Sequence, residues 1–176
     1  MKRGIHMVSD TLFFEAHLEN VAYDLAVSPP VIYGEEAKQA AKKYGSLDHG
    51  AYLWKNNENT VALKNKNSIS IAAHELRHAW QHKYEHTRFN YSVPAKQSRF
   101  RAFVSRKIYQ ATYLFNCKEI DADNFAADYC RRNRLTYDLG EVQERIFISR
   151  ISRISISIGL ICMLSSIAYL INVSIT

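Results

Sequence analysis

The sequence is poor in cysteine, and its few cysteines are spaced unfavourably for cross-links or clusters. Among 176 residues there are three, Cys117, Cys130 and Cys162, an odd number without C-x-x-C spacing. A disulfide framework and a cysteine-ligated metal site are therefore not expected. The sequence also lacks internal repeats. Its length indicates one domain with a sizeable core.

The N-terminus lacks a long apolar run. Lys2 and Arg3 are followed too soon by Asp10, Glu15 and Glu19 for a signal peptide. The folded part is therefore expected in the cytosol, with reduced thiols. A net charge of +6 favours proximity to an anionic surface, either a membrane or a nucleic acid.

Charge is absent from residues 154–176, which are mainly apolar and include several serines. About 20 such residues in a helix cross the hydrocarbon core of a bilayer. Arg145, Arg150 and Arg153 precede the run, and no Lys or Arg follows it, so the positive-inside rule keeps residues 1–153 in the cytoplasm. We expect a domain at 1–140, a basic juxtamembrane linker at 141–153 and a single transmembrane helix at 154–173. The alternative is a buried or oligomerising C-terminal helix.

Periodicity and turn residues predict a mainly helical α+β domain. A first helix is expected from Ser9 or Asp10 to about residue 27, with an apolar stripe of Leu12, Phe13, Leu18, Val21 and Leu25. Further helices are expected at about 35–44, 68–86 (capped by Ser68) and 118–133, with an amphipathic segment at 100–115. Two extended runs, 51–55 and 60–64, are joined by four turn-forming residues and predict a β-hairpin.

Residues 71–82 read IAAHELRHAWQH and contain the pattern H-E-x-x-H. On a helix, His74 and His78 project from one face, one turn apart, and can occupy two corners of a zinc tetrahedron. Glu75 lies about 100° round the helix, where it can reach a water but not ligate the ion. A His78–His82 pair is a rival chelate that lacks the intervening glutamate.

The run CKEIDADNFAADYC, residues 117–130, supplies candidates for a third ligand. On a helix, Glu119 and Asp123 share a face with two alanines, which permits close approach to the H-E-x-x-H helix. Glu119 is then the natural third ligand, and Asp123 can accept the distal N–H of a ligating histidine. Asp121 lies about 200° from Glu119 and is expected to point to solvent.

Together these residues resemble the gluzincin pattern H-E-x-x-H followed by E-x-x-A-D. The HtpX and CAAX-prenyl-protease families carry this pattern, and small minigluzincins share the core. The run Ala122 to Ala127 also resembles the ImmA/IrrE-like metallopeptidases. The resemblance covers roughly residues 50–130 and implies a minigluzincin-like core with a short sheet beside the active-site helix. It implies His74, His78 and Glu119 as zinc ligands, Glu75 as the base, and Asp123 as the partner of a ligand.

The resulting expectation is a zinc-dependent endopeptidase with one Zn²⁺ per chain, acting on a peptide or protein from the cytoplasmic side of a membrane whose lipid it contacts. The alternatives are a non-catalytic, membrane-anchored binding protein with a structural metal, and a basic nucleic-acid-binding module, which we disfavour. The basic, aromatic segment 88–107 is a candidate patch for nucleic acid or anionic lipid, or else a solvated helix face.

Two features of the expected active site stay open. The donor for the oxyanion could be any of Tyr84, Tyr91, His82 and His86. The run 60–64 is expected to be an edge strand, which a peptide substrate could join.

Overall fold

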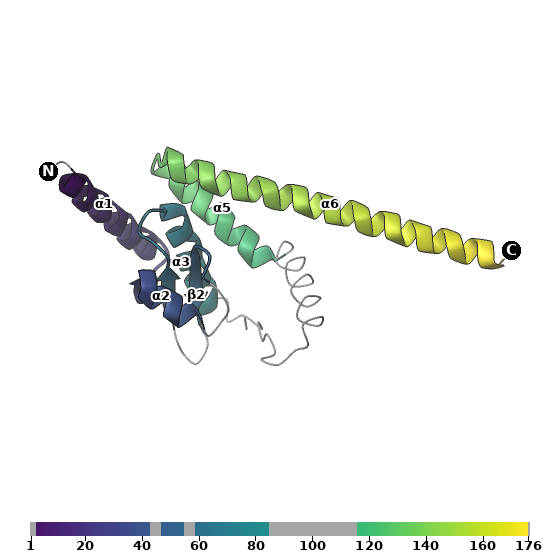
Figure 1. Ribbon diagram of the computed structural model, residues 1–176, viewed down its shortest axis with the longest axis horizontal. Helices are drawn as coiled ribbons and strands as arrows, with labels where there is room; N and C mark the ends of the chain where they lie inside the picture. The colour runs from purple at the N-terminus through teal and green to yellow at the C-terminus, as the bar shows by residue number, and fades with distance from the viewer. Residues whose placement is uncertain (1–2, 43–46, 55–58, 85–115, 176) are drawn as a thin grey trace.

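A computed structural model describes residues 3–42, 47–54, 59–84 and 116–175 (Figure 1). Within these ranges the fold is α+β, as predicted, with five helices and a three-stranded sheet. The elements in chain order are α1 (Arg3–Asp24), β1 (Val31–Tyr33), α2 (Gly34–Ala41), β2 (Gly50–Leu53), β3 (Thr60–Leu63), α3 (Ile69–Tyr84), α5 (Cys117–Arg132) and α6 (Thr136–Ile175).

The predicted hairpin is present, but β3 is not an edge strand. The strand order is β1-β3-β2, with β1 parallel and β2 antiparallel to β3. Strand β1 was not predicted, because three residues after Pro29-Pro30 are too few to show a period. The expectation that 60–64 forms an edge was therefore wrong, and the edge beside α3 belongs to β2.

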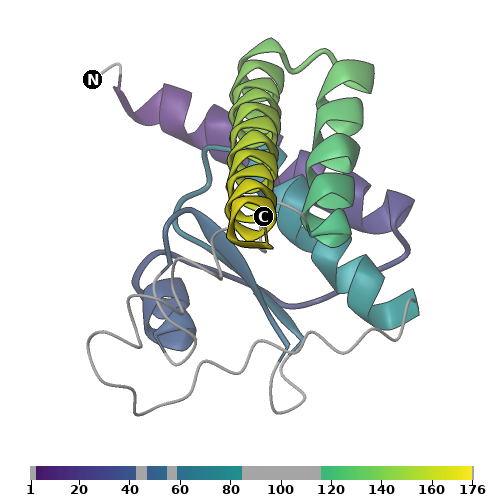
Figure 2. The same ribbon diagram turned by 90° about the vertical axis from the view of Figure 1, so that its right-hand side faces the viewer.

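The sheet separates two apolar clusters. On one face, Val61 and Leu63 of β3 join the main core, which they share with α1, α3, α5 and the start of α6. On the other, Ala62 packs with Leu53 against alanines of α2. The alternation along β3 is the two-residue period of a strand buried on both faces. Figure 2 shows α2 on one side of the strands, with α5 and α6 running side by side on the other.

Helix α1 buries a different stripe from the one expected. It begins at Arg3 rather than near Asp10, and Leu12 and Phe13 are exposed. Phe14 takes their place in the core, with the other three stripe residues as predicted: Leu18, Val21 and Leu25. Spacings of four, three and four residues keep these side chains on one face. The prediction erred by one position in the first turn of the stripe.

Helix α3 begins as predicted, but its cap is shared with α6. The Oγ of Ser68 accepts from the backbone N–H of Ile71 at 3.4 Å. The carboxylate of Asp138 in α6 accepts from the backbone N–H of Ser70 at 3.0 Å, and Ser68 Oγ lies 3.2 Å from Glu141. Carboxylates at a helix N-terminus satisfy its open N–H groups and complement its dipole. The start of α6 therefore fixes the start of the motif-bearing helix.

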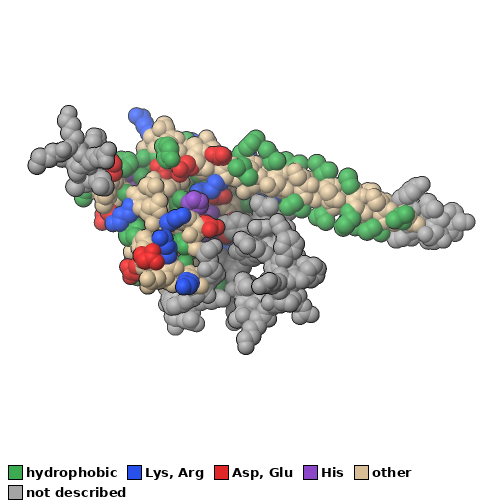
Figure 3. Space-filling view, in the orientation of Figure 1, with side chains coloured by type: hydrophobic (Ala, Val, Ile, Leu, Met, Phe, Trp, Pro, Cys, Tyr) green, Lys and Arg blue, Asp and Glu red, His purple; other side chains and the backbone are tan. Residues whose placement is uncertain are grey.

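Helix α6 is one continuous helix, so residues 141–153 are helical rather than a separate linker. Beyond the domain it extends as a straight rod (Figure 1) with green apolar side chains along it (Figure 3). A segment of it has a mean hydropathy of 1.7, with none of that segment buried inside the protein. The helix is thus long and apolar enough to cross a membrane. The described residues do not bury this apolar segment.

Several predicted features lie outside the described residues. They are the amphipathic segment 100–115, the basic segment 88–107, the hairpin residues 55–58, and two oxyanion candidates, His86 and Tyr91.

Candidate metal centre

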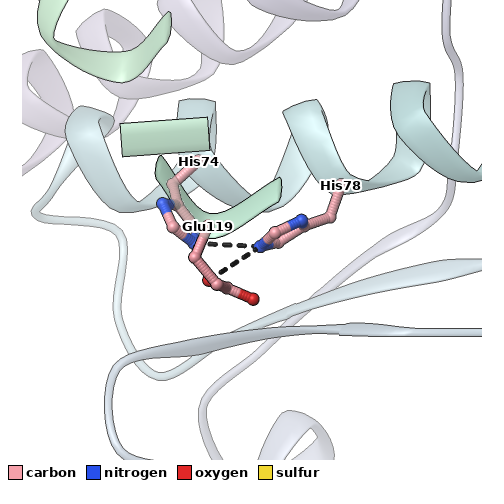
Figure 4. Close-up of side chains that lie close together, drawn as sticks. All are labelled: His74, His78 and Glu119. Carbon is pink, nitrogen blue, oxygen red and sulfur yellow. Dashed lines mark hydrogen bonds and ion pairs between the residues drawn. The ribbon is translucent and has the colours of Figure 1, made fainter. Parts of the chain in front are cut away.

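His74 and His78 of α3 converge with Glu119 of α5, as their spacing predicted (Figure 4). The two Nε2 atoms are 3.0 Å apart, and Glu119 Oε2 lies 3.3 Å from each. The histidines are buried, and the carboxylate is nearly so. The close approach of the two helices is possible because Ala122 and Ala126 of α5 are fully buried. Such a group could hold a metal ion.

The far side of each imidazole is held by an acceptor. Asp123 Oδ1 lies 3.0 Å from Nδ1 of His74, the contact that the helical geometry predicted. Gln81 Oε1 lies 2.9 Å from Nδ1 of His78. Each Nδ1 therefore carries a hydrogen, which leaves each Nε2 facing the cluster.

The orientation of the Gln81 amide is set by two further acceptors. Its Nε2 donates to the backbone oxygen of Lys118 at 3.0 Å and to Asp121 at 2.8 Å. Asp121 also accepts two hydrogen bonds from Arg77, at 2.7 and 3.2 Å. The expectation that Asp121 points to solvent therefore holds only in part. Its side chain is 42% exposed, but it anchors the partner of His78.

These contacts make the cluster incomplete without a cation. If both imidazoles are neutral with hydrogens on Nδ1, two nitrogen lone pairs and a carboxylate meet within 3.3 Å. Lone pairs so close in a buried site repel unless a proton or a metal ion lies between them. The donor set therefore fits a bound metal.

In the metal-free chain, a proton on His74 takes the place of the metal ion. Burial alone would lower the pKa of His74, but hydrogen bonds to Asp123 and Glu119 outweigh it and raise the pKa to about 10. Burial likewise opposes ionisation of Glu119, but hydrogen bonds from the two histidines hold its pKa well below the ordinary value. At neutral pH the metal-free site thus keeps an imidazolium beside a carboxylate.

Glu75 is buried next to the cluster, against β2. Burial raises its pKa, which the neighbouring imidazoles and a hydrogen bond from the backbone N–H of Tyr52 partly offset. Glycine at position 50 allows this approach: a Cβ there would lie 3.0 Å from Glu75 Cγ and 2.8 Å from Ile71 Cγ2. A carboxyl with a raised pKa beside a cation site is suited to accept and return a proton.

The other polar candidates on α3 make different contacts. Nδ1 of His82 lies 2.8 Å from the hydroxyl of Tyr52, which itself donates to Asn59. His82 is not part of the His74–His78–Glu119 group, so the rival chelate does not form. The hydroxyl of Tyr84 donates to the carbonyl of Ala26 at 3.2 Å, so Tyr84 supports the end of α1 instead.

Helix α6 also contacts the site. Arg145 donates to Asp123 Oδ1 at 3.3 Å, so the carboxylate that holds His74 is itself held by α6. Beyond this contact a small pocket lies between α5 and α6, and its lining includes Glu119, Asp123, Arg150 and Arg153. No sequence pattern linked Arg145 to the site, because the link depends on how α6 packs on α5.

Comparisons of the chain with protein-family models, with curated proteins and with solved structures found no match.

Proposed function

We propose that the protein is a zinc-dependent peptidase of gluzincin type, held at a membrane by α6. The observation that carries the proposal is the convergence of His74, His78 and Glu119, with both distal nitrogens held and the buried Glu75 alongside. Three protein ligands with a fourth position left for water are typical of catalytic rather than structural zinc.

The spacing of the three ligand atoms supports zinc. In a tetrahedral site with metal–ligand distances of about 2.0–2.1 Å, the ligand atoms lie about 3.3 Å from one another. The three distances here are 3.0, 3.3 and 3.3 Å. Two imidazoles and a carboxylate are also ligands that zinc accepts readily.

In the proposed reaction the protein positions a peptide and moves one proton. Zinc bound here would lower the pKa of a water and polarise a peptide carbonyl. Glu75 takes the proton of the attacking water and passes it to the nitrogen of the departing amine. Its raised pKa suits both steps, because a carboxylate of higher pKa takes a proton from water more readily and the resulting acid can still donate it to the amine nitrogen. Asp123 and Gln81 keep the imidazoles in the tautomer that binds metal.

The edge of β2 is the place proposed for the substrate backbone. The backbone N–H of Lys64 donates to the oxygen of His49, which fixes the hydrogen-bonded pairing of β2 with β3. The backbone N–H and C=O groups of Gly50 and Tyr52 therefore point away from β3, toward the free edge of the sheet. Glu75 meets the same edge through the Tyr52 N–H. An extended peptide that pairs with β2 would therefore lie beside the proposed base.

The first test combines metal content with hydrolysis. Wild-type and Glu75→Gln chains, purified with α6 intact, should each hold about one zinc, measured by elemental analysis. The variant should hydrolyse a mixed peptide library at least 10²-fold more slowly, because it has lost a general base.

Glu144→Gln is the matched control, because it removes one negative charge from an exposed position of α6. It should keep both zinc and activity. Wild-type chain that binds zinc but hydrolyses no peptide would instead indicate a non-catalytic metal-binding protein. A chain that binds no zinc would contradict the proposal entirely.

A further inference from the structure

We propose that α6 holds the metal site at a fixed, short height above the membrane, so that the substrates are membrane-anchored proteins cleaved just outside the bilayer. The inference rests on the proposed function, since it requires a peptidase and a membrane-spanning α6. It adds the substrate class and the position of the cleaved bond.

The domain and the proposed span share one continuous helix. Helix α6 runs from Thr136 to Ile175 without a break and contains no proline. Its first turns are fixed to the domain, because Asp138 accepts from the N–H of Ser70, Val142 is fully buried, and Arg145 donates to Asp123. Between the metal site and the apolar run there is thus no hinge of the kind that proline introduces.

Helix α6 also sets the height of the metal site above the membrane. Arg145 donates to Asp123, which in turn holds the proposed ligand His74, and the uncharged run begins at Ile154. At 1.5 Å per residue the two positions are separated by about 14 Å along the helix. A tilt of about 20° shortens this height by less than 1 Å. Polar headgroups extend about 5–7 Å beyond the hydrocarbon, so the site lies just above them.

A small pocket links the metal site to the start of the apolar run of α6. Glu119, a proposed zinc ligand, lines the same pocket as Arg153, the last charged residue before the apolar run. Arg150, one turn nearer the domain, is exposed and lines it too. Guanidinium groups at this level of a span lie close to lipid phosphates. The Glu119 side of the site therefore adjoins a pocket that reaches the start of the apolar run.

A peptide that leaves the bilayer must cover this height before it reaches the metal. An extended chain advances about 3.3–3.6 Å per residue, so about four residues are needed. Peptide bonds fewer than about four residues from the substrate's membrane span cannot reach Glu75, whereas bonds about four residues from that span can. The result is a lower limit on the distance between a substrate's own membrane span and its cleaved bond.

The test uses the full zinc-loaded chain in phosphatidylcholine–phosphatidylglycerol vesicles. Its substrates are synthetic peptides with one transmembrane helix and the same cleavable sequence placed zero to twelve residues from that helix. A soluble peptide of the same sequence gives the reference rate. We expect hydrolysis to appear at a spacer of about four residues and to be at least tenfold slower at zero to two.

A second chain repeats residues 147–153 between Arg153 and Ile154. Seven residues lift the domain by about 10.5 Å and rotate it by only about 20°. The lower limit should then move outward by about three residues, with the soluble peptide cleaved as before. The matched control adds the same seven residues after Thr176, and its limit should not move.

A measurement without hydrolysis separates this inference from the proposed function. Co²⁺ replaces zinc, and its quenching of a headgroup-bound fluorophore should weaken in the lengthened chain but not in the control. Unchanged quenching, or equal spacer limits in all three chains, would overturn the fixed height while leaving peptidase activity intact. Failure to cleave even the soluble peptide would instead remove the proposed function, and with it this substrate class.

Discussion

Each of the two proposed histidine ligands is held by a side chain that is not itself a proposed ligand. His74 depends on Asp123 and, through it, on Arg145. His78 depends on Gln81, whose amide is oriented by Asp121. The two chains of contacts pass through different residues of α5, so single substitutions test them separately.

The carboxylates of α5 should differ in their effect on zinc affinity. Glu119→Ala should nearly abolish zinc retention, because it removes a ligand. Asp123→Ala should weaken zinc binding by about 10- to 100-fold, because it releases the ring of His74. Asp121→Ala should cause a smaller but measurable loss, because it frees the Gln81 amide to turn. Zinc titration against a chromogenic chelator gives the three affinities.

Asp128→Ala is the control for this series, since Asp128 is an exposed residue of the same helix that pairs with Arg131. Its zinc affinity should equal that of the wild type. An Asp121→Ala variant that also matched the wild type would show that Gln81 does not need this anchor.

The metal-free chain should lose stability as the pH rises above 6.5. The pKa of His74 is raised from 6.5 to about 10 in the folded chain, so its contribution is complete below pH 6.5 and is lost as the pH rises through about 10. The lowered pKa of Glu119 contributes above its ordinary 4.5 and is lost as the pH falls. The cluster therefore stabilises the fold most between about pH 4.5 and 6.5.

Zinc affinity should show the opposite trend, because zinc must displace the proton of His74. Urea unfolding of the chelator-treated chain and zinc titration, each from pH 6 to 10, measure the two trends. The decline in stability should vanish in His74→Gln and persist in His49→Gln, which changes an exposed histidine. A decline that survives in His74→Gln would assign it to another group.

The convergence of His74, His78 and Glu119, and the contact of Asp123 with His74, were predictable from sequence, because rotation about a helix is local geometry. The Gln81–Asp121 link was not predicted, although Gln81 lies three residues after His78 on the same helix. Its partner belongs to another helix, whose orientation around its axis depends on packing. Arg145 carried no signal at all, since its role depends on the path of α6.

At the scale of elements, β2 approaches α3 closely at Gly50. Gly50→Ala should destabilise the fold by about 1–3 kcal/mol, the usual cost of overpacking, because its Cβ meets Ile71 and Glu75. It should also slow hydrolysis, since it displaces the proposed base. Urea unfolding and peptide hydrolysis measure the two effects.

Gly140→Ala is the matched substitution with the opposite expected sign. Gly140 lies inside α6, where a Cβ meets nothing within 4 Å. Alanine there should stabilise the helix by about 0.5–1 kcal/mol. Stabilisation at both positions would show that β2 can move away from α3 without cost.

Sequence periodicity predicted α1, α2, α3, α5, the apolar part of α6 and the β2–β3 hairpin, because each depends on contacts between near neighbours in the chain, but it missed the helical residues before Ile154 in α6. It missed β1, which is stabilised through its parallel pairing with β3. That omission also produced the error about which strand forms the edge. Parallel pairing joins segments that are distant in sequence, so no local pattern reports it.

For the whole molecule, the prediction concerns attachment to membranes. The full chain should remain in the membrane fraction after a carbonate wash, because a spanning helix is held far more firmly than a surface contact. A chain ending at Arg150 keeps Val142, Arg145 and the caps on α3, and it should be released. Immunoblotting of the pellet and supernatant provides the measurement. Release of the full chain would mean that α6 does not span.

The dependence of α3 on α6 also bears on the order of events during synthesis. A ribosome makes His74 and His78 well before Glu119, and it makes Asp138 and Arg145 later still. Until those later residues emerge, α3 lacks the carboxylate that accepts from Ser70, and His74 lacks the Asp123–Arg145 support. A nascent chain at that stage therefore has His74 and His78 before the contacts that fix α3 and the ring of His74 have formed. If the site binds zinc as proposed, metal capture is expected at the end of folding, after α6 has docked on α3 and α5.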